Sequence, residues 1–290
     1  MNNEPNFPKR LIFDSHSHFG LFGENIIKNH LVNPFANGRE ISSLKDLQIY
    51  MQTYDLAKVL IVPHYTPDQN KPFNIYNSMI INTVINSNNV LGGLWVSPLS
   101  QVWDKTKQVL ASLPLHNIVA LKISPDSWEK GITLNPQSWN LELTEHFEMI
   151  VEACIKNNLV LHIHTGTGNS DVLTFDPFVK KYGSNLKIQF VHMGGSMGGH
   201  LAFVPRFIQW LKDGHNFYCD TSNSKGFGPA WLVNEMKEQY PRGLKNILFA
   251  SDNPWGDFKS EFWKIENIKC DDSIKNNIYY YNAQKLYCLK

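Results

Sequence analysis

Eight short apolar runs, rich in β-branched and aromatic residues, recur along the 290-residue chain, and segments with helical spacing of apolar positions separate most of them. The runs cover residues 11–16, 58–63, 90–97, 118–124, 159–164, 187–192, 216–222 and 246–251. The clearest helical segments are 42–56, 144–158 and 199–212. Alternating strands and helices predict a parallel sheet, and eight such units in about 250 residues match a closed (β/α)8 TIM barrel. A doubly wound open sheet is the alternative.

No linker rich in Gly, Ser or Pro divides the chain, so we expect a single α/β domain over 1–290, with a flexible N-terminal segment over 1–10. The longest insertion between predicted elements, 124–142, is typical of a loop over a site. The four cysteines are far apart and form no CxxC pair, which predicts free thiols rather than disulfides or a structural zinc knot.

The charge balance limits the partners of this chain. Its 27 basic and 26 acidic side chains nearly cancel, and no run of like charges predicts a surface for nucleic acid or for a membrane. No apolar stretch approaches the ~18–20 residues of a membrane span, and the N-terminal residues are polar. We therefore expect a cytoplasmic protein whose partner is a small-molecule substrate, with a homodimer left open.

Ionisable side chains stand at the carboxyl ends of five predicted strands. They are His16 and His18 on the first strand, Lys122 on the fourth, His162 and His164 on the fifth, His192 after the sixth and Asp252 after the eighth. In a parallel barrel these ends converge on one small volume. Because side chains alternate between the two faces of a strand, we expect Asp14, His16 and His18 on one face and Phe13 on the other.

Imidazole and carboxylate groups bind zinc and similar divalent ions, and three histidines with one carboxylate leave an open coordination position. The pair His16 and His18 is not specific alone, because histidines two apart also occur as hydrogen-bonded structural residues. Asp252 has its own alternative as a turn residue in SDNP, and His192 as a packed residue ahead of a glycine turn. Together with His164, each at the end of a separate strand, they predict a metal site.

These motifs resemble a known family. DSHSH, LHIHTG, FVHMGG and LFASDNPW, with the ending YYYNAQKLYCL, are similar to the amidohydrolase superfamily and look most like its amidohydrolase-2 branch, which includes aminocarboxymuconate-semialdehyde decarboxylase and related hydrolases. The resemblance runs from about residue 11 to the C-terminus and implies a (β/α)8 barrel.

The resemblance also implies a cofactor and its ligands. It implies one divalent ion, first of all Zn²⁺ with Mn²⁺ or Fe²⁺ as alternatives, bound by His16, His18, His164 and Asp252. His162 competes for the place on the fifth strand, but the family's histidine directly precedes TG, as His164 does. His192 would stand beside the metal and the substrate as a catalytic residue.

Lys122 has three readings, because a lysine inside a barrel must be paired or lose its charge. A contact to the substrate is preferred over an ion pair with Asp14 and over a carboxylated lysine that bridges a second metal ion. Asp14 is expected behind the ligands, where it would orient a ligand histidine, and His162 is expected there too. The remaining candidates for the wall of the substrate pocket are Trp95, Trp255 and His64.

The leading hypothesis is metal-dependent hydrolysis of an ester, lactone or amide. A metal ion would lower the pKa of water and polarise the carbonyl, Asp252 would accept the water proton, and His192 would stabilise the oxyanion. Decarboxylation of an unsaturated or aromatic acid is the alternative. It is disfavoured modestly, because only four arginines are present to bind a carboxylate. A catalytically silent barrel is a third hypothesis, which the complete ligand set opposes.

Overall fold

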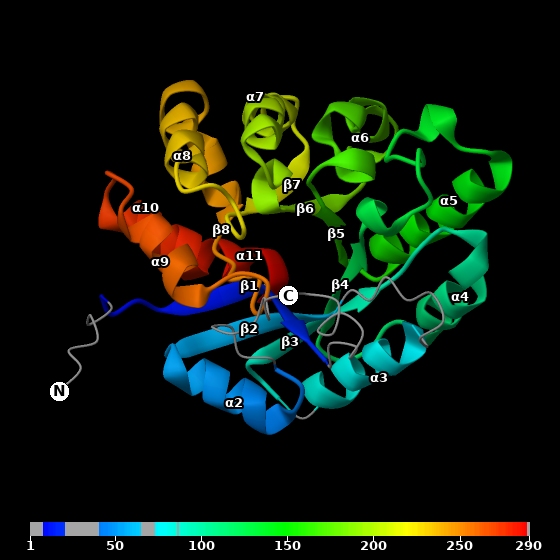
Figure 1. Ribbon diagram of the computed structural model, residues 1–290, viewed down its shortest axis with the longest axis horizontal. Coiled ribbons are helices and arrows are strands. Elements are labelled where there is room, and N and C mark those ends of the chain that lie inside the picture. Colours follow the sequence, from blue (N-terminus) through cyan, green and yellow to red (C-terminus); the bar gives the residue numbers. More distant parts are fainter. Residues whose placement is uncertain (1–7, 21–40, 65–72, 86, 289–290) are drawn as a thin grey trace, which may run out of the picture.

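The computed structural model describes residues 8–20, 41–64, 73–85 and 87–288. Eight parallel strands form one sheet in the order β1 to β8, and helices lie around them (Figure 1). The strands are β1 (Ile12–Phe19), β2 (Leu56–Pro63), β3 (Val90–Trp95), β4 (Ile118–Ile123), β5 (Val160–His164), β6 (Lys187–Val191), β7 (Asn216–Asp220) and β8 (Ile247–Leu248). Sequential neighbours confirm the (β/α)8 barrel and exclude the doubly wound sheet, whose strand order reverses.

The barrel closes where β1 meets the chain that follows β8. The amide of Ser15 donates to the carbonyl of Phe249 at 3.1 Å, and the amide of His18 donates to the carbonyl of Asn253 at 2.7 Å. Between them, the amide of Asp252 donates to the carbonyl of His16 at 2.9 Å. The first and last predicted strands are therefore joined by main-chain hydrogen bonds at the residues that were expected to bind metal.

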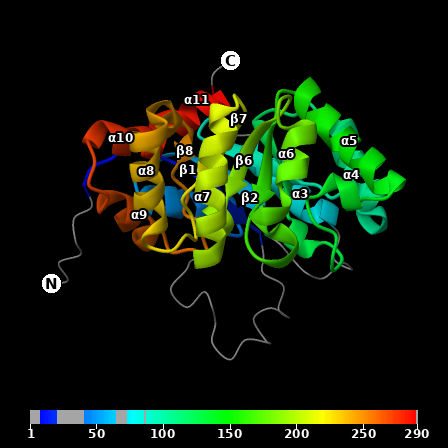
Figure 2. The same cartoon turned by 90° about the horizontal axis from the view of Figure 1, so that it is seen from above.

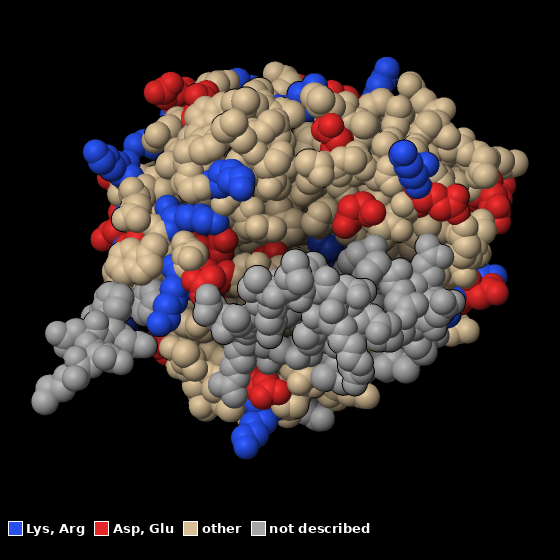
Figure 3. Space-filling view, in the orientation of Figure 1, with Lys and Arg blue, Asp and Glu red and all other residues tan. Residues whose placement is uncertain are grey.

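The helices surround the strands, and Figure 2 shows α6, α7 and α8 side by side along one flank. Their bounds are α2 (Leu44–Thr53), α3 (Phe73–Val84), α4 (Trp103–Ser112), α5 (Leu141–Lys156), α6 (Asp176–Tyr182), α7 (Met197–Lys212), α8 (Gly228–Gln239), α9 (Phe258–Glu266), α10 (Asp272–Asn276) and α11 (Asn282–Cys288). In the described ranges, no helix is both long and apolar enough to span a bilayer. Acidic and basic side chains are mixed over the described surface visible in Figure 3.

The predicted boundaries need small corrections. Strand β1 continues through both histidines to Phe19, whereas β8 has only two residues because the chain turns towards β1. Helix α5 begins at Leu141 rather than at 144, because the side chain of Asn140 accepts a hydrogen bond from the amide of Leu143 and caps the helix. The flexible segment expected over 1–10 lies mostly outside the described residues.

The expectation that Asp14 shares one face of β1 with His16 and His18 is wrong. Phe13 belongs to a cluster inside the barrel, where the C-terminal helix α11 covers one end, and its ring lies 5.9 Å from that of Tyr287. Asp14 points outwards and accepts a hydrogen bond from Tyr50 of α2 at 2.8 Å. The reason is a β-bulge between Asp14 and Ser17, where β1 takes three steps while β2 takes two. The bulge resets the phase of the strand ahead of His18.

Candidate metal centre

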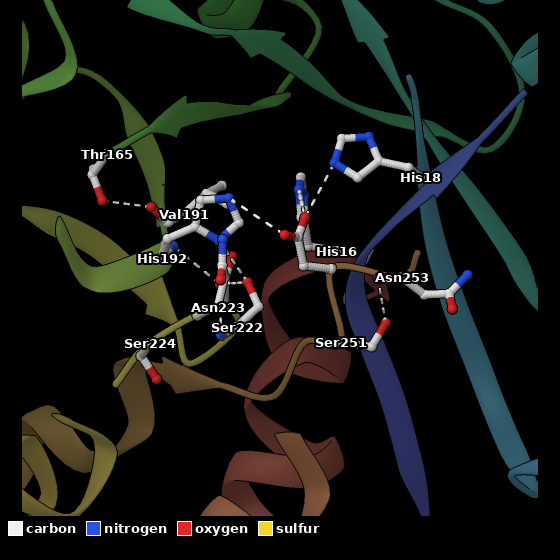
Figure 4. Close-up of polar contacts among 12 residues, drawn as sticks. His16, His18, Thr165, Val191, His192, Ser222, Asn223, Ser224, Ser251 and Asn253 are labelled. Carbon is white, nitrogen blue, oxygen red and sulfur yellow. Dashed lines mark hydrogen bonds and ion pairs between the residues drawn. The ribbon is translucent and has the colours of Figure 1, made fainter. Parts of the chain in front are cut away.

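Three of the predicted ligands lie together at the carboxyl ends of β1 and β8. One ligand atom each from His16, His18 and Asp252 falls within 4.8 Å of the other two. Oδ1 of Asp252 lies 3.1 Å from Nε2 of His18 and 3.4 Å from Nε2 of His16. All three residues are buried. Figure 4 shows the rings of His16 and His18 arriving from β1, with His192 on the other side.

The protonation pattern of this cluster fits a cation. Nδ1–H of His18 donates to the carbonyl of Pro63 at 3.0 Å, and Nε2 of the same ring lies 3.1 Å from Oδ1 of Asp252. Both ring nitrogens of His16 are buried without a hydrogen-bond partner among the described residues. Burial, and secondarily the charge of Lys122, hold the pKa of His16 well below its usual value. Imidazole nitrogens around a carboxylate are the donor set of a divalent metal ion.

The two histidines of β5 have different surroundings. His162 is engaged away from the cluster, because its Nε2 bonds to the hydroxyl of Tyr287 on α11 at 2.5 Å. His164 lines the same cavity as His18 and Asp252, and its ring lies 4.9 Å from that of His192. It is not one of the three clustered donors. Of the two, His164 is therefore the candidate for a fourth ligand.

His192 lies across the cluster from β1, with Nε2 3.9 Å from Oδ2 of Asp252. It begins the turn after β6 and has φ of 74°, in the left-handed region that residues with a Cβ seldom adopt. Its Nδ1 lies 2.9 Å from Oγ of Ser222 (Figure 4). Burial lowers the pKa of His192 to about 3, so the imidazole is neutral. Backbone strain of this kind is typical of functional residues.

Asp252 is held in place by its neighbour on the chain. Asp14 accepts hydrogen bonds from the amide of Ser251 at 2.9 Å and from its hydroxyl at 2.6 Å. Asp252 itself has φ of 55°. Asp14 therefore fixes the turn that carries Asp252, whereas the sequence predicted that it would orient a histidine ring. Burial would raise the pKa of Asp252, but His192 and the two histidines of β1 outweigh it and hold that pKa well below 3.8.

Lys122 of β4 opens onto the same cavity, which has a volume of about 230 Å³. Its side chain is only 1% exposed, and its Nζ has no hydrogen-bond partner among the described residues. Burial lowers its pKa to about 8, against the opposing charges of Asp220, Asp252 and Asp126. The ion pair with Asp14, one of the two less favoured hypotheses, is not formed. A buried ammonium without a partner is costly, which marks it as a group that a ligand would satisfy.

The aromatic candidates divide between the cavity and its surroundings. Trp95 and Trp255 both line the cavity, the first buried and the second exposed at its mouth. His64 instead stacks on the ring of His18, with centroids 5.4 Å apart.

Sequence reasoning missed several cavity residues. Ser124 and Asp126 follow β4, and Asn223 follows β7. Asp220 and Ser222, which reach His192, were also missed, although they stand at the carboxyl end of β7 in FYCDTS. The search for polar residues at the carboxyl ends of strands, which found the candidate metal ligands, would have found these residues too.

The family model Amidohydro_2, described as amidohydrolase, matches residues 42–289. No curated protein sequence matches the chain. Among solved structures, 5-carboxyvanillate decarboxylase from Sphingomonas paucimobilis is 13% identical, with 97% of this chain and 100% of that chain covered and a TM-score of 0.64.

Two further structures share the fold. A probable 2-pyrone-4,6-dicarboxylic acid hydrolase from Acinetobacter baumannii, with citric acid bound, is 12% identical over 96% of this chain and 99% of its own, with a TM-score of 0.65. A dihydroxybenzoic acid decarboxylase from Polaromonas, with bound manganese and the inhibitor 2-nitroresorcinol, is 13% identical over 96% and 97%, with a TM-score of 0.62. Because the family model spans most of its length, this chain belongs to the amidohydrolase-2 family of enzymes.

Proposed function

We propose that this enzyme hydrolyses a small ester, lactone or amide that carries an anionic group, with one divalent metal ion as cofactor. The observation that carries the proposal is that His18 and Asp252 of the donor cluster line the same cavity as Lys122, whose ammonium has no hydrogen-bond partner among the described residues. Such a cavity combines a site that activates a carbonyl with a cation that anchors an acid group.

The proposed cofactor site uses the clustered donors, with His164 as the fourth ligand. A divalent ion bound there would polarise a substrate carbonyl and lower the pKa of a water molecule. Zn²⁺ is proposed first, because two or three imidazoles and a carboxylate suit it. The manganese of the Polaromonas decarboxylase supports Mn²⁺ as the alternative.

The side chains of this enzyme would then do the remaining work. Lys122 binds the acid group of the substrate, and Trp95 and Trp255 confine its body. Asp252 and His192, 3.9 Å apart, hold the proton that leaves water when its oxygen bonds to the carbonyl carbon. When the bond between that carbon and the leaving oxygen or nitrogen breaks, the leaving atom takes this proton.

Decarboxylation of an unsaturated or aromatic acid is the second candidate, and a specific observation favours it. The sequence offered few arginines to bind a carboxylate, but Lys122 supplies a buried cation, and two tryptophans line the cavity. Two of the structures that share the fold are decarboxylases of aromatic acids. In this reaction the bond between the substrate carbon and its carboxylate breaks and CO2 leaves, while the carbon takes a proton that water supplies by way of Nε2 of His192, leaving hydroxide.

The test is a substrate screen of the protein loaded with Zn²⁺ or Mn²⁺. Esters, lactones and amides are offered as anionic and neutral pairs, together with unsaturated and aromatic acids, while acid release and CO2 are measured in the same reactions. We expect hydrolysis of anionic members, with kcat/KM falling by about 100-fold in Lys122→Met for these and little for neutral members. Release of CO2 without hydrolysis would select the second candidate. A metal-loaded protein inactive in every reaction would contradict both.

A further inference from the structure

A chain of hydrogen bonds runs from His192 through the inside of the barrel to the C-terminal helix. Nδ1 of His192 lies 2.9 Å from Oγ of Ser222, and that hydroxyl donates to Oδ1 of Asp220 at 2.6 Å. Nε2 of Gln189 donates to the other carboxylate oxygen at 2.7 Å, and Oε1 of Gln189 accepts from the hydroxyl of Tyr287. Every one of these side chains except Tyr287 is fully or almost fully buried, so water does not compete for them.

The protons in this chain can be assigned by counting donors. Asp220 receives hydrogen bonds from Gln189, from the hydroxyl and amide of Ser222, and from the amide of His192 at 3.2 Å. Four donors surround the carboxyl group, which is the environment of an ionised carboxylate.

The tautomer of His192 follows from the hydroxyl of Ser222. A serine hydroxyl has one proton, and that of Ser222 is given to Asp220. Its oxygen can therefore only accept from the ring of His192, so the proton of the neutral imidazole sits on Nδ1. The lone pair is left on Nε2, which is the nitrogen that faces Asp252.

We propose that Ser222 and Asp220 are positioning residues that hold His192 as the Nδ1–H tautomer, with Nε2 as a proton acceptor in the cavity. The inference rests on the proposed function and refines it. In this tautomer His192 cannot donate to an oxyanion from Nε2 at the start of the reaction. It must first take a proton there, as an O–H bond of water breaks and an N–H bond forms, and can donate only afterwards.

The same assignment distinguishes His192 from its neighbour His162. The single proton of the Tyr287 hydroxyl goes to Gln189, so this oxygen accepts from Nε2–H of His162. His162 on β5 and His192 after β6 thus carry their protons on opposite ring nitrogens. Gln189 links the two histidines, because it bonds to Asp220 on one side and to Tyr287 on the other.

The decisive experiment is a measurement of ring-nitrogen protonation in protein labelled with ¹⁵N-histidine, at neutral pH, alone and with Zn²⁺. Protonated and unprotonated ring nitrogens resonate in separate regions of the ¹⁵N spectrum, and the signals of His192 are those lost in His192→Gln. We expect a protonated Nδ1 and an unprotonated Nε2 in the wild type. A proton on Nε2 of His192 would overturn the inference, whatever the protein catalyses.

Variants of Ser222 test the cause. Ser222→Ala should give a mixture of tautomers, while Ser222→Thr, which keeps a hydroxyl, should retain the wild-type spectrum. Ser224→Ala is the matched control, because the hydroxyl of Ser224 bonds to the carbonyl of Thr221 at 2.6 Å and has no bond to His192. An unchanged tautomer in folded Ser222→Ala would contradict the role of Ser222. If that variant does not fold, the wild-type and Ser222→Thr spectra still decide.

Kinetics with a substrate from the screen supply a second readout. We expect kcat to fall by about 10–100-fold in Ser222→Ala with KM unchanged, and Ser222→Thr to restore most of it. A rise in KM at constant kcat would show that Ser222 shapes the substrate pocket instead. Failure of the screen would count against the proposed function alone, because the spectra need no substrate.

Discussion

Several residues of the cavity have features that destabilise the fold and are typical of a functional site. His192 and Asp252 have left-handed backbone angles, and Lys122 is a buried ammonium without a partner in the described structure. Each of these features costs folding free energy, by about 1–3 kcal/mol for a strained residue. Their concentration in one cavity is the pattern expected of an active site, where groups are held ready for a ligand.

The clustered donors predict how metal affinity responds to substitution. His16→Ala and Asp252→Asn should each weaken Zn²⁺ binding by at least about 100-fold, because each removes a direct ligand rather than a group behind one. Affinity is measured by titration with a competing chelator. His162→Gln is the control, and it should leave affinity nearly unchanged because its Nε2 is engaged by Tyr287. If His162→Gln lost Zn²⁺ and His164→Gln did not, His162 rather than His164 would be the ligand from β5.

Lys122→Met should stabilise the ligand-free protein. The lysine pKa falls from 10.5 to about 8 on folding, a cost of ~3 kcal/mol at neutral pH that methionine removes. In the wild type this cost is relieved as the pH rises from about 8 to 10.5, because the folded protein has released the proton that the unfolded chain still holds. Denaturant unfolding of both proteins across this range checks the sign. Equal stability at neutral pH would mean that Lys122 has a partner.

At the scale of elements, the turn between β6 and α7 places His192. Gly194 has φ of 88°, and a Cβ there would lie 2.4 Å from the carbonyl oxygen of Gly199. A Cβ on Gly199 would lie 1.9 Å from the carbonyl oxygen of Gly194. The two glycines therefore allow the start of α7 to approach the turn that follows His192. The sequence motif MGGSMGG serves packing between backbones.

Alanine substitutions at two adjacent glycines distinguish the effect of this backbone packing on stability from the effect of helix propensity. Gly199→Ala should destabilise the protein by at least about 2 kcal/mol, because backbone must move to admit the methyl group. Gly198→Ala is one residue away, meets nothing within 4 Å, and should be neutral or stabilising by about 0.5–1 kcal/mol. Thermal and denaturant unfolding give both values. A harmless Gly199→Ala would show that the turn and helix are not in contact.

Across the whole molecule, ion pairs as well as main-chain hydrogen bonds join the start of β1 to the segment that follows β8. Nε and Nη2 of Arg10 donate to the two carboxylate oxygens of Glu266 at 2.9 and 3.1 Å, and further bonds reach Asp272 and Asn276. Arg10 precedes β1, and its partners lie on α9 and α10. This network fastens the N-terminal strand to the helices that follow β8.

Arg10→Met should therefore lower the free energy of unfolding by about 1–3 kcal/mol, because it removes both hydrogen bonds to the partly buried carboxylate of Glu266 and leaves it only the ammonium of Lys275 at 3.8 Å. Arg206→Met is the matched control. Its ion pair with Asp176 joins two exposed side chains and is worth about 0–1 kcal/mol. Urea unfolding at low and high salt measures both. Equal losses in the two variants would mean that Arg10 makes an ordinary surface ion pair.

The sequence by itself determined the barrel and predicted the cluster of His16, His18 and Asp252. Alternating apolar runs and helical segments are local signals, and strand ends in a parallel barrel must meet, so His16, His18 and Asp252 could be predicted to converge. The family motifs predicted His164 rather than His162 as the ligand on the fifth strand, and the structure places His164 in the cavity while Tyr287 engages His162.

Only the tertiary structure decided which way the side chains face and what they contact. The bulge after Asp14 put both histidines of β1 out of phase with Asp14, which faces α2, because one extra residue on one strand depends on how two strands pair. The partners of His192 come from β7, and Tyr287 reaches His162 from 125 residues away. Such contacts depend on which groups meet in the folded interior, and local pattern in the chain does not encode them.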